Sequence, residues 1–96
     1  MNKDTQLVVT RHPGLVEFLE KEGIIKKNCQ VLRHVIARDV EGKHVIGVLP
    51  AWLAVHALSV TEVEMDLPDE LRGKELSVEE IDEHVTRIWT YRVEEL

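Results

Sequence analysis

Two short apolar runs, each closely followed by a proline, constrain the fold of this chain more than any other feature. Residues 6–10 and 44–49 are rich in β-branched side chains, as buried strands are. Pro13 and Pro50 come after them, and proline suits the first turn of a helix because its missing N–H is not needed there. The sequence therefore predicts two strands that each lead into a helix, which is the pattern of an α/β protein.

The other segments extend this alternation of strands and helices. Residues 31–38 and 60–67 are expected to form strands, and residues 51–58 an apolar helix that is covered on most sides. Gly23 is placed to end the first helix. The order predicts a mainly parallel sheet with helices on both faces, in one small Rossmann-like α/β domain.

A capping box opens the last predicted element. Ser77 and Glu80 have the spacing at which each side chain bonds the backbone of the other residue. Apolar residues then follow at helical spacing: Val78, Ile81, Val85, Ile88 and Trp89. We therefore expect a long terminal helix.

Composition predicts a single domain over residues 1–96. The 96 residues, 44% hydrophobic and 31% charged, would bury roughly 65% of their unfolded surface, so self-association would add useful burial. No apolar stretch approaches the roughly 18 residues of a membrane span, and no signal-peptide pattern opens the sequence. The single cysteine, Cys29, cannot form an internal disulfide. We expect a protein of the cytoplasm with no membrane partner.

Charge is distributed unevenly along the chain. The net charge of −6 argues against a protein that binds nucleic acid without specificity, and DNA is not expected as a partner. Residues 1–48 nevertheless carry eight Lys and Arg against six Asp and Glu, whereas residues 49–96 carry four against twelve. An anionic ligand is therefore expected against the first half.

The turn after the first strand holds the densest group of functional side chains. Thr10, Arg11, His12, Pro13 and Gly14 combine a hydroxyl, a cation and an imidazole with a predicted helix N-terminus. Helix N-termini favour phosphate, arginine forms paired hydrogen bonds with phosphate oxygens, and histidine transfers protons. Arg11 and His12 are the predicted catalytic residues, and the other three are predicted to bind the ligand. The alternative is a structural turn in which Thr10 caps the helix.

The second strand-to-helix turn should lie beside the first, because parallel strands place their carboxyl ends at one edge of a sheet. Gly47, Leu49, Pro50 and Trp52 are predicted ligand-binding residues there. Glycine inside a buried strand often marks the close approach of a ligand or of another backbone. Tryptophan near a helix start can stack on a base, although packing in a core or interface is the commoner use.

The remaining polar candidates are more scattered. His34 and Asp66 are predicted ligand-binding residues because each is placed near the same edge, whereas His56 lies in an apolar segment and is expected in the core. The histidines lack metal-ligand spacing, so neither a metal nor another cofactor is expected. The Thr-Arg-His tripeptide also resembles the turn of histidine phosphatases, but Pro13 replaces their glycine and the chain is less than half the usual length of that fold.

Three motifs in order resemble the small CRISPR-associated (Csx-type) accessory proteins of type III systems, which have a reduced CARF-like fold. They are Val-Thr-Arg-His-Pro-Gly at residues 9–14, Val-Ile-Gly-Val-Leu-Pro at residues 45–50, and the segment of residues 65–77. The resemblance implies a ring nuclease that binds and cleaves cyclic tetra-adenylate, the second messenger of the antiviral response. Where that family usually has Gly-Thr-Leu-Pro, this chain has Val48 in place of threonine, so a hydroxyl there cannot be essential.

The implied reaction requires no metal in principle. A 2′-hydroxyl attacks its own phosphate in line and leaves a 2′,3′-cyclic phosphate and a 5′-hydroxyl, provided that the protein holds the attack geometry. The ring contains a two-fold axis, which suits a homodimer whose two 10–14 turns face each other. Two other classes stay open: a module that sequesters the nucleotide without cleaving it, and a protein-interaction subunit.

Overall fold

Strand β1 (Gln6–Val9) leads through a short turn into helix α1 (Pro13–Lys21) in the computed structural model, which describes residues 5–96. Both elements are where the sequence predicts them. Gly23 adopts a left-handed φ of 72° just beyond the helix, and its N–H donates to the Glu20 carbonyl oxygen at 3.1 Å. The predicted glycine stop of α1 is therefore confirmed.

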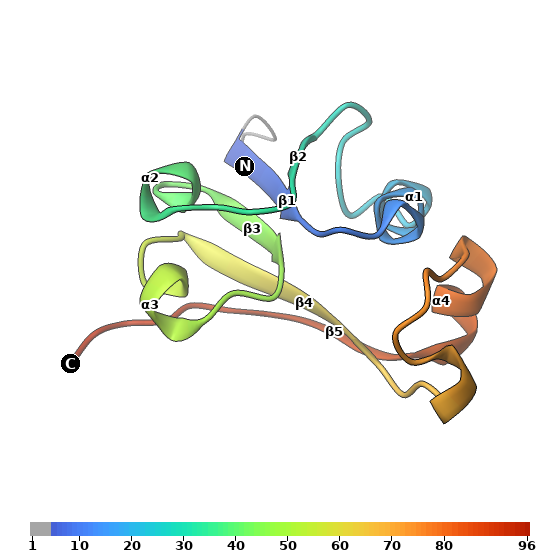
Figure 1. Ribbon diagram of the computed structural model, residues 1–96. Helices are drawn as coiled ribbons and strands as arrows, with labels where there is room; N and C mark the ends of the chain where they lie inside the picture. The colour runs from blue at the N-terminus through green and yellow to red at the C-terminus, as the bar shows by residue number, and fades with distance from the viewer. Residues whose placement is uncertain (1–4) are drawn as a thin grey trace.

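The other elements continue the alternation (Figure 1). They are β2 (Gln30–Leu32), α2 (Ala37–Val40), β3 (His44–Gly47), α3 (Ala51–Ala54), β4 (Ser59–Met65), the 3-10 helix η2 (Asp69–Leu71), α4 (Val78–His84) and β5 (Val85–Tyr91). The five strands form one sheet in the order β2-β1-β3-β4-β5. The first four strands in this order are parallel, and β5 is antiparallel to β4. This confirms a small α/β domain with a mainly parallel sheet.

Helices cover both faces of the sheet, as predicted, and α2 with α3 lies on the opposite side from α1 with α4 (Figure 1). Successive residues of a strand point to opposite faces, so Leu7 and Val8 of β1 enter different cores. One core contains Leu7, Val40, Val45, Leu49, Leu53, Ala54, Ala57 and Val60. The other contains Val8, Phe18, Leu19, Ile25, Ile46, Leu76, Val78 and Ile81.

The prediction of a long terminal helix is wrong. The capping box is present, since the Glu80 N–H donates to Ser77 Oγ at 3.1 Å and the Ser77 N–H donates to Glu80 Oε1 at 3.0 Å. However, α4 ends at His84, and the next residue begins β5. Residues 85–91 are rich in β-branched and aromatic side chains, which favour a strand once β4 offers an edge for pairing.

Two further predicted elements are shorter than expected. The strand expected over residues 31–38 ends at Leu32, and α2 begins at Ala37, where the Asp39 carboxylate accepts a hydrogen bond from the Ile36 N–H at 2.8 Å. Within the segment expected as a helix over residues 51–58, α3 stops at Ala54. His56 lies in the turn that follows and is exposed, so the expectation of a core histidine is wrong.

Candidate functional site

A pocket of about 310 Å³ opens at the carboxyl ends of the parallel strands. Its floor is apolar and its rim is basic. The floor contains residues of three strands and of α1, namely Val9, Ile46, Val63, Met65 and Leu15, and the rim includes Thr10, Arg11, His12, Arg33, Gly47 and Val48. The lining contains three basic side chains and no acidic one, so the pocket suits an anion that also carries an apolar group.

The 10–14 turn contributes the polar side of this pocket. The His12 N–H donates to Thr10 Oγ1 at 3.1 Å, and the Leu15 N–H donates to the His12 carbonyl oxygen at 3.0 Å. Thr10 therefore shapes the turn itself, and the N-cap position of α1 is occupied by His12 without a side-chain capping bond. Thr10, Arg11 and His12 line the pocket together, with both basic side chains exposed.

Two glycines allow close backbone contacts beside the pocket. At Gly47, φ is +147°, and a Cβ there would collide with the carbonyl oxygen of Val9 on the neighbouring strand. At Gly14, a Cβ would collide with the carbonyl oxygen of Leu76. In both cases the approaching group is another segment of backbone, so these glycines set the spacing of the elements around the pocket.

Arg33 also lines the pocket, although the sequence did not single it out. It lines the pocket beside Arg11, because β2 ends at Leu32 and Arg33 is the first residue beyond the strand. The predicted strand over residues 31–38 includes Arg33, so the sequence does not predict that Arg33 lies just beyond the carboxyl end of a strand. The spacing of Asp39 after Ile36, which suits a cap at the start of α2, is the signal that a helix begins within this segment.

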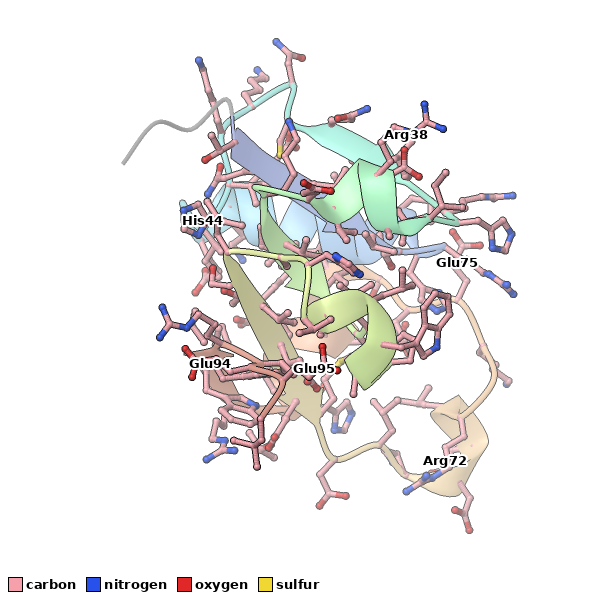
Figure 2. All side chains as sticks on the ribbon, turned by 90° about the vertical axis from the view of Figure 1, so that its left-hand side faces the viewer. Arg38, His44, Arg72, Glu75, Glu94 and Glu95 are labelled. Atoms are coloured by element: carbon pink, nitrogen blue, oxygen red, sulfur yellow. The ribbon has the colours of Figure 1, made fainter. Side chains whose placement is uncertain are left out.

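The other predicted site residues lie outside the pocket. Leu49 is 8% exposed and belongs to the core beneath α3, while Pro50 is the exposed N-cap residue of that helix. Trp52 is 67% exposed and lines a different pocket, between α3 and the carboxyl-terminal segment, where Figure 2 labels Glu94 and Glu95. His34 and Asp66 are exposed and line none of the described pockets.

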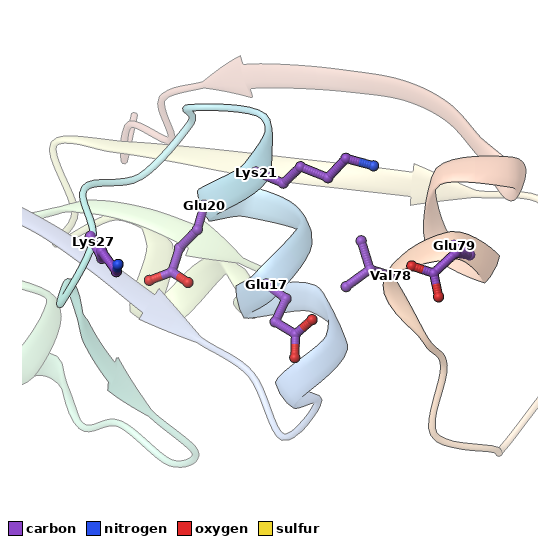
Figure 3. A pocket seen from close by; sticks show the side chains of 6 residues that line it. All are labelled: Glu17, Glu20, Lys21, Lys27, Val78 and Glu79. Atoms are coloured by element: carbon purple, nitrogen blue, oxygen red, sulfur yellow. The ribbon is translucent and has the colours of Figure 1, made fainter.

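A pocket of mixed charge lies between α1 and α4, on the face of the sheet that these helices cover (Figure 3). It is lined by Glu17, Glu20, Lys21, Lys27, Val78 and Glu79, with the two lysines offsetting part of the acidic charge. The adjoining hollow reaches Pro13 and Gly14, but its polar side chains are Glu17, Glu75, Ser77 and Glu79. Pro13 and Gly14, which are predicted to bind the ligand, therefore line this acidic hollow and not the basic pocket.

The outer end of the sheet carries an aromatic pair. The rings of Trp89 and Tyr91 lie 4.6 Å apart between centroids, and the Arg87 guanidinium stands 4.3 Å from the centre of the Trp89 ring. The Tyr91 hydroxyl donates to Glu62 on β4. Burial, followed by the bond to this carboxylate and its charge, raises the pKa of Tyr91 to about 12. This cluster stabilises the β4–β5 pairing, away from the basic pocket.

Residues 5–96 contain neither a metal-binding cluster nor a membrane-spanning helix. No group of three or more His, Cys, Asp or Glu side chains in this range is arranged to hold a metal ion. No helix in the range is long and apolar enough to cross a bilayer. Both expectations that concern absent partners, metal and membrane, remain predictions.

The fold and the pocket together define a small α/β domain with a basic pocket at the carboxyl ends of its parallel strands. A family model described as "Putative CRISPR-associated protein (Cas_VVA1548)" matches residues 7–94, and the chain belongs to this family. The CRISPR association implied by the sequence resemblance is therefore confirmed. Searches of curated proteins and of solved structures found no match to the chain.

Proposed function

We propose that this protein is a ring nuclease of type III CRISPR systems that binds and cleaves cyclic tetra-adenylate. The observation that carries the proposal is the pocket in which Arg11, His12 and Arg33 stand over an apolar floor. A nucleotide has matching parts, since its phosphate pairs with arginine and its base packs on apolar side chains. Membership of a CRISPR-associated family supports a nucleotide signal of that system as the ligand.

The position of the pocket in the sheet supports the same proposal. The strand order β2-β1-β3-β4-β5 matches an order common in doubly wound sheets, apart from the antiparallel direction of β5, and so supports the proposed Rossmann-like, reduced CARF-like fold. In such sheets the ligand binds beyond the carboxyl ends of the strands, at the point where the strand order reverses. That point lies between β1 and β3, and the pocket is lined by Thr10 after β1 and by Gly47 at the end of β3.

The pocket is the size of one nucleotide unit. Its volume of about 310 Å³ is at the small end of the range of about 300–1,000 Å³ for ligand pockets. A ring of four nucleotides therefore needs more than one copy of the pocket. A homodimer with two pockets facing across its two-fold axis would hold opposite units of the ring.

The proposed reaction is an attack by the ligand on itself. The 2′-oxygen forms a bond to the adjacent phosphorus, the bond from phosphorus to the 5′-oxygen breaks, and the products are a 2′,3′-cyclic phosphate and a 5′-hydroxyl. His12 accepts the proton of the 2′-hydroxyl or supplies a proton to the leaving 5′-oxygen. Arg11 stabilises the negative charge that develops on the phosphate oxygens.

Incubation of the purified protein with cyclic tetra-adenylate in EDTA, followed by chromatography, tests the proposal. We expect linear products that end in a 2′,3′-cyclic phosphate. A ring that is bound but returned intact would make the protein a sequestering module. A ring that is neither bound nor cleaved would favour a protein-interaction subunit.

A further inference from the structure

We propose that Arg33 is the second arm of a phosphate clamp, in which it binds the same phosphodiester of the ligand as Arg11. The inference rests on the proposed function, because it assumes a phosphodiester ligand in the basic pocket. It adds a binding residue that directly follows β2, a strand that the motifs of the sequence do not include.

The sheet register places the two arginines one residue apart, just beyond the last paired residues of β1 and β2. Val9 of β1 lies opposite Leu32 of β2, and the Thr10 N–H donates to the Leu32 carbonyl oxygen at 3.0 Å. Pairing between the two strands therefore continues to the mouth of the pocket. Arg33 directly follows Leu32, and Arg11 lies two residues after Val9, on chain segments that continue two strands about 4.8 Å apart. Both side chains line the pocket, from adjacent chain segments.

The charge of the two arginines is unbalanced. Arg72, Arg87 and Arg92 each form an ion pair with a carboxylate, at 3.5, 3.3 and 2.7 Å respectively. Within residues 5–96, neither Arg11 nor Arg33 forms such a pair, and no acidic side chain lines their pocket. Two cations that share a pocket repel each other unless an anion lies between them. A bound phosphodiester would supply that anion.

The chemistry of arginine limits what the second arm can do. A guanidinium keeps its proton at any physiological pH, so Arg33 cannot act as an acid or base. Its planar fork can instead donate two parallel hydrogen bonds to phosphate oxygens. Two forks on one phosphodiester would fix its orientation, which in-line attack by the 2′-hydroxyl requires.

Binding measurements with a ring that cannot be cleaved test the clamp. The probe is cyclic tetra-adenylate with 2′-O-methyl groups, which lacks the attacking hydroxyl, and affinity is measured by calorimetry over a range of salt concentrations. The variants are Arg33→Ala and Arg33→Lys. Arg92→Ala is the matched control, since it removes the same charge at a distance from the pocket. Arg92 follows β5, whose end pairs with the beginning of β4, whereas the pocket lies at the end of β4.

We expect Arg33→Ala to bind the probe about 10- to 100-fold more weakly than the wild type. The slope of log affinity against log salt should also fall by about 0.7, because one contact to a phosphate is lost. The affinity of Arg33→Lys should lie between those of the wild type and Arg33→Ala, since lysine keeps the charge and loses the planar fork of donors. Arg92→Ala should keep both the affinity and the slope. An Arg33→Ala protein that folds and binds like Arg92→Ala would overturn the clamp.

Cleavage of natural cyclic tetra-adenylate by the wild type is measured separately, so that the two proposals can fail independently. Binding without cleavage would overturn the nuclease and keep the clamp if Arg33→Ala still loses affinity. Where the ring does not bind, the linear dinucleotide adenylyl-3′,5′-adenosine, which carries one phosphodiester, serves as the second probe. Binding of this dinucleotide that depends on Arg33 would keep the clamp without the nuclease. Binding of neither probe would overturn both.

Discussion

Arg11 and His12 are neighbours in one turn, yet the residue types differ in the work that they can do. Arginine offers a permanent charge and a rigid fork of donors, whereas histidine can gain or lose a proton near neutral pH. Both side chains line the pocket and are exposed. Substitution of His12 should therefore affect mainly the rate, whereas substitution of Arg11 should also weaken binding.

Arg11→Ala is expected to weaken the binding of cyclic tetra-adenylate and to leave the fold intact. A charge-assisted contact to phosphate contributes about 1.5–3 kcal/mol, and the Arg11 side chain lies outside both cores. Calorimetry gives the affinity, and circular dichroism checks the fold. Unchanged affinity would place the ligand elsewhere on the molecule.

His12→Ala is expected to lower the cleavage rate by roughly 10²- to 10⁴-fold with little change in affinity, the usual contribution of general acid–base catalysis. Single-turnover rates from pH 5 to 9 provide the measurement, because a histidine that transfers the proton makes the rate depend on pH in this range. If the pH profiles of the wild type and the variant coincide, His12 has no role in proton transfer. Thr10, His34 and Asp66 would then be tested next.

Among the elements, β1 and β3 form the part of the sheet on which the pocket depends. A side chain at residue 47 would meet the Val9 carbonyl oxygen and would also sit at a φ of +147°. Gly47→Ala is therefore expected to cost about 2 kcal/mol or more of unfolding free energy. Gly73→Ala is the control, since its φ is +77° but no atom lies within 4 Å of the added carbon. Urea denaturation should show the smaller loss, about 1 kcal/mol, for the control.

The β4–β5 pairing has a titration of its own. The chain contains one tyrosine, so tyrosinate absorbance reports Tyr91 alone. We expect a midpoint near pH 12, which Glu62→Gln lowers because the carboxylate charge is removed while burial and a neutral acceptor oxygen remain. Glu64→Gln on the same strand should leave the midpoint in place. A midpoint near the ordinary value of about 10 in the wild type would contradict this account.

The sign of the pH effect follows from the direction of this shift. The pKa of Tyr91 is higher in the folded protein than in the unfolded chain, so folding favours the protonated phenol. The resulting stability is fully present below about pH 10. It is lost as the pH rises from there through about 12.

Local sequence signals predicted the elements that local chemistry controls. Pro13 marks the start of α1, Gly23 marks its end, and Ser77 with Glu80 marks the start of α4. The structure of residues 85–91 could not be predicted from such signals, because their apolar spacing fits a helix and their composition fits a strand. Only pairing with β4, which is distant in sequence, decides between the two.

The candidate site divides in the same way. The 10–14 turn follows a strand whose end is marked by the sequence, so Thr10, Arg11 and His12 could be placed at the sheet edge in advance. Arg33 could not, because the apolar pattern of residues 31–38 suits a longer strand than β2, which ends at Leu32. Leu49 and Trp52 could be assigned to the correct turn, but the side of the sheet that each faces depends on how α3 packs.

At the scale of the whole molecule, we expect a homodimer. A pocket of one-nucleotide size cannot enclose a ring of four, and the exposed apolar side chains include Ile36 after β2, and Val48 and Trp52 after β3. Light scattering at micromolar concentration should report about twice 11.0 kDa. A protein that stays monomeric when cyclic tetra-adenylate is added would contradict the shared site.

The two tryptophans occupy opposite surroundings, and this gives the protein two fluorescent probes of its own. Trp52 on α3 is 67% exposed, whereas the indole nitrogen of Trp89 is buried and its ring packs against Tyr91 and Arg87. A water-soluble quencher such as iodide should therefore reach Trp52 first, leaving a shielded emission that belongs to β5. Replacing either tryptophan with phenylalanine would isolate the other signal, so that events at the start of α3 and separation of β5 from β4 could be followed in one unlabelled protein.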